Sequence, residues 1–203
     1  MKEINVRATF LEEVLGSLPG NRDVYKDFIA SKAPSQEMAD EEIEQMDAST
    51  MEEKGTTVFL KDESGHPYLY DYQIKGFFKE AMGMLRMCKG TKCEQVKSYK
   101  KKIDGLVFIY DRKIPILNPM GGKIRKDQIG ICQRPLRGQT AQGERISLAC
   151  SETVPAGSHV DFTIKILDDS LFDAIIECLN YGELKGLLQW RNSGKGRFKW
   201  EEI

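Results

Sequence analysis

The stretch LKGLLQWRNSGKGRF, residues 184–198, is the most informative part of this sequence. Its glycines let the backbone turn with positive φ and let another chain come close, and the N–H groups of such a turn can form a concavity that binds anions. Arg191, Lys195 and Arg197 add positive charge that suits a phosphate backbone, and Trp190 offers a face on which a base can stack. The alternative is a glycine-rich loop that only caps a helix before a final strand.

The spacing of these glycines resembles the C-terminal signature of the RAMP superfamily, the RNA-binding repeat-associated proteins of CRISPR systems. The signature has a glycine, an apolar residue, another glycine, five residues with at least one Lys or Arg, and then Gly-x-Gly. Gly186, Gly194 and Gly196 match it in position, and Arg191 lies among the five intervening residues. Leu188 departs from the pattern, because the family expects glycine there.

Two further motifs upstream resemble the backbone subunits of type III CRISPR complexes. Lys61-Asp62, Pro67 and Ile74-Lys75-Gly76 follow the order of a turn and a Leu-Lys-Gly segment that opens a helix in the family, although 70–73 differ from its Pro-Gly-Ser-Ser. Glu152–Gly157 resembles the Glu-x-Val-Pro-x-Gly turn that precedes an alternating strand. In the family a basic hairpin, or thumb, lies just before this turn, where this chain has residues 137–141.

Length and composition limit the classes of protein to which this chain can belong. The chain has 203 residues, which suits one sizeable hydrophobic core, and its 40% hydrophobic and 30% charged residues predict a soluble globular protein. No apolar run approaches the length that crosses a membrane, and the N-terminus lacks the apolar core of a secretory signal. Five cysteines without metal-finger spacing favour a reducing cytoplasm.

Charge is distributed unevenly along the chain although the formal net charge is only −1. Residues 37–53 are acidic and residues 75–126 are basic. A near-neutral total therefore does not exclude nucleic acid, because a local basic face is what attracts it. The alternative for each charged run is an ordinary solvated surface.

Alternation of apolar and polar residues predicts half-buried strands. We expect strands at Ile4–Phe10, Thr56–Leu60, Tyr68–Tyr70, Leu106–Tyr110, Lys113–Ile116, Arg145–Ala149 and His159–Ile166, and a closing strand with Phe198 and Trp200.

Helical periodicity predicts two principal helices. One spans Gln73–Met87, and Gly76 fits near its first turn, where free N–H groups can hold a phosphate. The other begins at Ser170 as the capping residue, with Asp173 as its capping-box partner, and ends at Gly182 as a C′ glycine.

The remaining segments are expected to be connections or insertions. Residues 20–55 are predicted to form a helical insertion. Within it, Ser35 begins an acidic helical stretch, which is either a solvated surface or a contact for a basic partner. Lys89–Lys102 is predicted to be a polar connection. Asn118–Gly143 shows little periodicity, and so long an irregular segment is usually functional or disordered.

This order of elements predicts an α+β fold with a ferredoxin-like or RRM-like core. We expect a single RAMP-like domain over residues 1–203, with the acidic helical insertion at 20–55 and a basic thumb-like loop or hairpin at 117–144. Such sheets present one open face, which RNA-binding versions use with aromatic and basic residues.

The resemblance implies that single-stranded RNA is the ligand, or else single-stranded DNA. It also implies a place in antiviral defence, with copies of the chain or other CRISPR-type subunits assembling along the nucleic acid. The expected nucleic-acid-binding residues are Lys75, Gly76, Lys79, Arg134, Arg137, Gln139, Gly186, Trp190, Arg191, Gly194, Lys195, Gly196 and Arg197.

No catalytic residue, metal or cofactor is expected. Type III members cut RNA with an Asp in the loop before the Lys-Asp turn, and the corresponding position lies near Thr56, where no Asp is present. Metal-dependent cleavage needs a carboxylate to hold Mg²⁺, so we predict that the chain is not a nuclease; Asp62 and Asp71 are the reserve candidates. The alternative function is an interaction protein from a mobile element that binds or mimics a CRISPR subunit through the acidic insertion.

Overall fold

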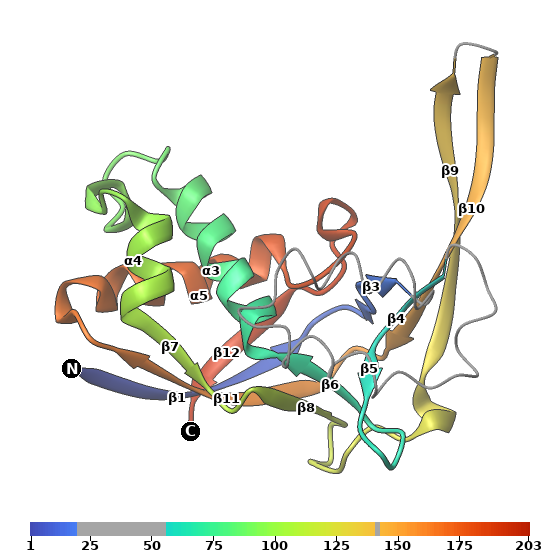
Figure 1. Ribbon diagram of the computed structural model, residues 1–203, viewed down its shortest axis with the longest axis horizontal. Helices are drawn as coiled ribbons and strands as arrows, with labels where there is room; N and C mark the ends of the chain where they lie inside the picture. Colours follow the sequence, from blue (N-terminus) through green and yellow to red (C-terminus); the bar gives the residue numbers. More distant parts are fainter. Residues whose placement is uncertain (20–55, 141–142) are drawn as a thin grey trace.

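The computed structural model describes residues 1–19, 56–140 and 143–203, with the backbone alone for 136–140 and 143–148 (Figure 1). The helical insertion expected at 20–55, including its opening residue Ser35, lies outside the described residues.

A seven-stranded antiparallel sheet forms the centre of the molecule. Its order is β12-β1-β11-β8-β6-β5, with β7 paired to β11 beside β8. The strands are β1 (Lys2–Phe10), β5 (Leu60–Lys61), β6 (Pro67–Tyr70), β7 (Val107–Tyr110), β8 (Lys113–Leu117), β11 (His159–Ile166) and β12 (Phe198–Glu202).

Three described helices lie on one face of this sheet: α3 (Asp71–Leu85), α4 (Tyr99–Leu106) and α5 (Phe172–Lys185) (Figure 1). Along the chain, β1, α3, β7, β11, α5 and β12 occur in this order with other elements between them, and in space their strands are ordered β12-β1-β11-β7. This is the split βαβ arrangement of ferredoxin-like folds. The expected α+β class with a ferredoxin-like core is therefore confirmed.

A second, five-stranded sheet adjoins the first and carries a long hairpin. Its order is β2-β10-β4-β3, with β9 paired to β10, and the β9–β10 ribbon projects away from the rest of the fold (Figure 1). The pairing runs from Gly130 opposite Thr153 to Thr140 opposite Gly143. The strands are β2 (Val14–Leu15), β3 (Leu18–Pro19), β4 (Thr56–Val58), β9 (Gly130–Thr140) and β10 (Gly143–Val154).

The hairpin agrees with the thumb-like loop or hairpin expected at 117–144, but it corrects the expectation that 118–143 is irregular, because β9 occupies eleven of those residues. Periodicity failed here for a physical reason: a projecting two-stranded ribbon has little core to face, so its strand needs no regular alternation of apolar and polar residues. Ile131 in β9, for example, is 65% exposed.

The strand expected at Thr56–Leu60 is two strands that belong to different sheets. β4 pairs with β10, and β5 pairs with β6. At the break, the N–H of Phe59 donates to the side-chain Oε2 of Glu152 in β10 at 3.0 Å instead of to a backbone carbonyl. A side chain that is distant in sequence thus ends the hydrogen bonding between β4 and β10. The local sequence pattern does not reveal this break.

The connection expected at Lys89–Lys102 contains a 3₁₀ turn, η2 (Cys93–Gln95), and the start of α4. Ile103 is the one residue of α4 that is fully buried. Tyr99 and Leu106, one turn to either side of Ile103, are partly buried against the same core. This stripe of three residues in an eight-residue helix is shorter than the window over which helical periodicity can be recognised, which is why the sequence was read as a connection.

The ends of the two principal helices also differ from expectation. A 3₁₀ turn, η4 (Asp169–Leu171), precedes α5, and it is Asp168 that caps this turn by accepting the Ser170 N–H at 3.0 Å. α5 continues through Gly182 to Lys185, and its C-cap is Gly186, whose φ is +78°. α3 begins at Asp71, so Gly76 is its sixth residue and lies beyond the first turn, whose N–H groups are free.

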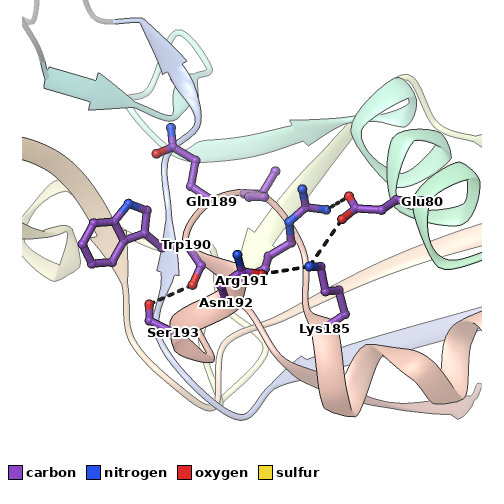
Figure 2. Close-up of a pocket in the computed structure, with 8 residues that line it drawn as sticks. Glu80, Lys185, Gln189, Trp190, Arg191, Asn192 and Ser193 are labelled. Atoms are coloured by element: carbon purple, nitrogen blue, oxygen red, sulfur yellow. Dashed lines mark hydrogen bonds and ion pairs between the residues drawn. The ribbon is translucent and has the colours of Figure 1, made fainter. Parts of the chain in front are cut away.

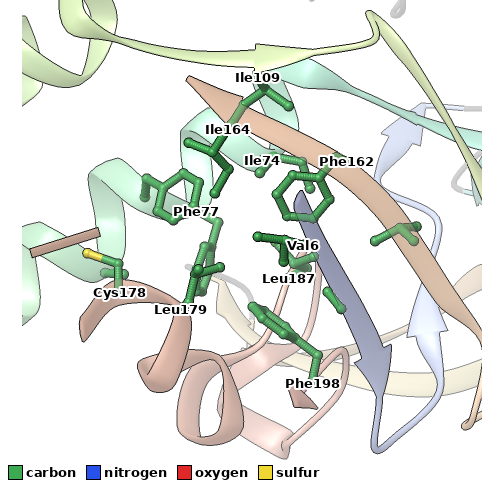
Figure 3. Packing of buried hydrophobic residues seen from close by; sticks show 14 of the residues in the cluster. Val6, Ile74, Phe77, Ile109, Phe162, Ile164, Cys178, Leu179, Leu187 and Phe198 are labelled. Carbon is green, nitrogen blue, oxygen red and sulfur yellow. The ribbon is translucent and has the colours of Figure 1, made fainter. Parts of the chain in front are cut away.

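The hydrophobic core lies between the helices and the seven-stranded sheet. Even-numbered residues of β1 and β11, such as Val6 and Ile164, face Phe77 of α3 and Leu179 of α5 (Figure 3). The ring of Phe198 from β12 packs edge-on against Phe77, with 5.3 Å between the ring centroids. The core therefore joins β12 to α3.

Two glycines within helices test how tightly this core is packed. A Cβ on Gly182 would overlap the ring of Phe198, whereas a Cβ on Gly76 would meet nothing within 4 Å. Gly182→Ala should therefore lower the free energy of unfolding by about 1–3 kcal/mol through overpacking, despite the better helix propensity of alanine. Gly76→Ala is the matched control and should raise the free energy of unfolding by about 0.5–1 kcal/mol. Urea unfolding of both variants measures the difference, and equal effects would contradict this packing.

Candidate nucleic-acid interface

The glycine loop, residues 186–197, joins α5 to β12 by bringing two backbone segments into contact. The Leu187 N–H donates to the Gly196 carbonyl at 2.9 Å. A Cβ on Gly186 would come within 2.5 Å of the Gly196 carbonyl carbon, and a Cβ on Gly196 would overlap the Leu187 carbonyl. Gly186 and Gly196 are therefore required for the loop to close.

Most of the loop's C-terminal N–H groups are already bonded within the protein. Those of Ser193 and Lys195 donate to the Trp190 carbonyl, that of Gly194 donates to Arg191, and that of Gly196 donates to Glu13. These four donors are not available to an anion. The anion-binding concavity expected from the glycine pattern is thus not built from residues 193–196.

Leu188 has a left-handed backbone with φ of +63°, and Trp190 has φ of +56°. This conformation costs roughly 1 kcal/mol or more for a residue with a Cβ. Glycine, the residue that the expected motif has at the position of Leu188, adopts this conformation without that cost. Leu188 therefore replaces a glycine, but its backbone keeps the left-handed conformation that favours glycine.

The cations of the loop are paired with carboxylates from distant segments. Lys195 contacts Glu13 at 2.9 Å and Arg197 contacts Glu12 at 3.3 Å. Arg191 pairs with Glu80 of α3. The positive charge that makes the loop attractive to a phosphate chain is therefore largely compensated inside the protein.

Sequence reasoning missed these three carboxylates. Glu12 and Glu13 stand together directly after the first strand, which is the only local signal that they bear on the glycine loop. Glu80 lies four residues after Gly76, on the same side of α3.

Among the described cations that contact the glycine loop, Arg134 of β9 differs in having no carboxylate partner. It is only 6% exposed, and its guanidinium carbon lies 3.5 Å from the centre of the Trp190 ring. Nη2 reaches Oε1 of Gln189 at 3.4 Å, while Nε and Nη1 find no hydrogen-bond partner among the described residues. Burial lowers the pKa of Arg134, because a desolvated guanidinium is less stable in its charged form.

A cavity of about 760 Å³ opens beside the loop, between α3 and the 3₁₀ turn η5 (Arg191–Ser193). Figure 2 shows Arg191 and Lys185 directed toward Glu80, with Trp190 on the other side of the loop. Leu188, Gln189, Asn192 and Ser193 complete the lining. Gly76 lines an adjoining cavity of about 280 Å³, to which Arg191 also contributes.

Other expected site residues lie elsewhere. Lys75 donates to the Asp104 carbonyl of α4 at 3.2 Å, and Lys79 pairs with the Asp104 carboxylate, so both lysines are directed toward α4. Arg137 and Gln139 lie in β9, where only the backbone is described. The structure thus gathers Arg134, Gly76 and the loop residues, but it does not bring Lys75 and Lys79 to them.

Within residues 1–19, 56–140 and 143–203, no three His, Cys, Asp or Glu side chains are grouped so that they could hold a metal ion. In the same part of the chain, no helix is long and apolar enough to span a membrane.

Together, the fold and site define an α+β protein with a ferredoxin-like core, a projecting hairpin and a glycine loop at the hairpin's base.

No family model and no curated protein matches the chain, whereas 130 chains of solved structures do. One is in the "Cryo-EM structure of the Type III-B Cmr-beta bound to cognate target RNA", with a TM-score of 0.47 and 12% identity. All of this chain is covered, but only 59% of that one.

The strain at Leu188 can be measured with a pair of variants. Leu188→Gly and Leu188→Ala both remove the side chain, but only glycine relieves the positive φ. Leu188→Gly should therefore be more stable than Leu188→Ala by about 1 kcal/mol. Thermal or urea unfolding of the pair gives this difference directly, and an alanine variant at least as stable as the glycine variant would rule out a strained left-handed backbone.

Proposed function

We propose that this chain is a non-catalytic, RAMP-type protein that binds single-stranded RNA at the junction of the glycine loop and the β9–β10 hairpin. Copies of the chain, or other subunits of a CRISPR-type complex, assemble with it along the nucleic acid.

The observation that carries this proposal is the buried guanidinium of Arg134 against the ring of Trp190. A buried cation with two unpartnered N–H-bearing nitrogens is costly unless a ligand supplies an acceptor. Arginine binds phosphate with paired, charge-assisted hydrogen bonds. The exposed part of the neighbouring Trp190 ring is available for a base. A phosphate and its base are thus the chemical groups that would satisfy this pair.

The spatial relation of the RAMP-like motifs supports the family part of the proposal. Lys61 of the Lys-Asp turn pairs with Glu152 of the Glu-x-Val-Pro-x-Gly turn at 2.6 Å, although 91 residues separate them. The Gly16 N–H donates to the carbonyl of the same Glu152 at 2.8 Å. Two motifs that were recognised separately are therefore parts of one structural junction, next to the base of the hairpin.

The non-catalytic part of the proposal rests on Thr56, which occupies the position near which type III members have their nuclease Asp. Thr56 lies in β4 opposite Cys150 of β10. The reserve candidate Asp62 is engaged in its own turn, where it accepts the N–H groups of Ser64 and His66 and pairs with Lys123.

The direct test is binding of the purified chain to labelled single-stranded RNA and DNA across a salt series, with size-exclusion profiles of the mixtures. Salt-sensitive binding to RNA, growth of the complex with RNA length, and RNA that stays intact in the presence of Mg²⁺ are expected. Absence of binding to both strands would overturn the proposal and would direct attention to a protein partner. Cleavage that depends on Mg²⁺ would overturn the non-catalytic part alone.

Arg134→Met separates binding from stability. The variant keeps the apolar stem but removes the guanidinium, so RNA affinity should fall about tenfold, while the free energy of unfolding should change by less than about 1 kcal/mol because few protein hydrogen bonds are lost. Fluorescence anisotropy and urea unfolding measure the two quantities.

The matched control for this variant is Arg125→Met, which removes an exposed arginine that pairs with Asp127. It should leave affinity nearly unchanged. Equal losses of RNA affinity in the two variants would mean that Arg134 contributes only a nonspecific electrostatic attraction.

Glu12 and Glu13 should compete with phosphate for the loop cations. The double variant Glu12→Gln, Glu13→Gln keeps side-chain size but frees two positive charges, so RNA should bind more tightly and the slope of log affinity against log salt should steepen by about one to two units. Lys195→Ala with Arg197→Ala should have the opposite effect on both quantities. If all four substitutions leave the slope unchanged, the glycine loop is a structural cap rather than part of the interface.

A further inference from the structure

Two aromatic side chains on β7 face solvent from the side of the sheet that the helices do not cover. Phe108 is 41% exposed and Tyr110 is 56% exposed, whereas the alternate residues Val107 and Ile109 are buried against the helices. Alternation along the strand therefore places two large rings on the open face. Nothing in the core requires an aromatic residue at either position.

Each of these rings has a lysine ammonium close to it. Nζ of Lys165 lies 4.0 Å from the centre of the Tyr110 ring, and Nζ of Lys75 lies 4.9 Å from the centre of the Phe108 ring. Lys165 comes from the neighbouring strand β11, opposite Phe108, while Lys75 comes from the first half of α3. We name these four side chains the β7 platform.

The surroundings of the platform leave some positive charge available. Lys165 also contacts Glu3 at 3.2 Å, but both side chains are partly exposed, so water screens this pair. The amino group of Lys75 donates to a neutral carbonyl, that of Asp104. Burial lowers the pKa of Lys75, with the charge of Asp104 opposing that shift. A phosphate would therefore be attracted more strongly to either ammonium group than to a neutral surface.

The spacing of the two rings suits neighbouring bases. Residues two apart on a strand are separated by roughly 6.6 Å and project from the same face. Successive bases of a single strand stack on such exposed rings, each worth about 1–3 kcal/mol, while nearby lysines hold the backbone. An apolar protein segment would also cover the rings, but it would bring no acceptor for the two ammonium groups.

We propose that the β7 platform is a second binding surface for single-stranded nucleic acid, in which Phe108 and Tyr110 stack two bases and Lys75 and Lys165 contact the adjoining phosphates. This surface does not share residues with the glycine loop. In Figure 1, β7 lies toward the end of the sheet that is remote from the β9–β10 hairpin. One strand of sufficient length could therefore engage both surfaces of one molecule.

The test uses the full chain and a short oligouridylate of about six nucleotides, which is near the smallest site size for such surfaces. The double variant Phe108→Leu, Tyr110→Leu keeps apolar bulk but removes the stacking faces, and should lower affinity at least tenfold. Leu184→Ala is the matched control, since this α5 residue is 72% exposed and lies outside both proposed surfaces. It should leave affinity unchanged.

A single charge change gives an independent readout if the double variant folds poorly. Lys165→Gln should reduce the salt slope of binding by about one unit. Ultraviolet crosslinking followed by mass spectrometry should also attach uridine to Tyr110 or Phe108. Unchanged affinity in the double variant, together with an unchanged slope for Lys165→Gln, would overturn the platform.

Trp190→Ala distinguishes this surface from the glycine loop. Loss of binding only in Trp190→Ala would support the loop and overturn the platform. Loss only in the Phe108 and Tyr110 variant would support the platform and overturn the proposed loop site. Losses in both would support both surfaces, and a wild-type chain that binds no oligonucleotide would overturn both.

Discussion

Close packing at three glycines holds the C-terminal part of the molecule together. Gly182 lets the ring of Phe198 lie directly against α5, and the contact between Gly186 and Gly196 closes the loop that leads from α5 into β12. Because β12 pairs with β1, these contacts attach the helical layer to the first strand of the sheet. The same closure brings the loop cations to the segment after β1, where Glu12 and Glu13 meet them.

The electrostatic character of the interface follows from that closure. The glycine loop is basic in sequence but nearly neutral in the folded protein, because Lys195, Arg197 and Arg191 each pair with a carboxylate. Arg134 differs because it approaches from the hairpin and meets the Trp190 ring instead of an acid. Among the described residues around the loop, a phosphate would therefore meet one uncompensated buried cation, Arg134, and would compete with glutamates for Arg191, Lys195 and Arg197.

Much of the central sheet could be predicted from sequence because its strands have one buried face. β1 and β11 alternate almost perfectly, and the structure places them where the pattern did. The elements that were missed have a short buried face or little core to face: α4 contacts the core only through Tyr99, Ile103 and Leu106, and β9 belongs to a projecting ribbon. Gly182 was mistaken for a helix end, because a glycine that accommodates a distant ring looks the same in sequence as one that ends a helix.

By itself, the sequence determined the ferredoxin-like order of strands and helices and the spacing of the loop glycines, since both depend on local periodicity and backbone conformation. It also identified Arg134 and Trp190 as separate candidates. Only the tertiary structure decided that these two are stacked and that the loop cations are paired. Lys195 and Glu13 are 182 residues apart in the chain. The free energy of such a pair depends on distance and burial in space, which no local pattern of residues encodes.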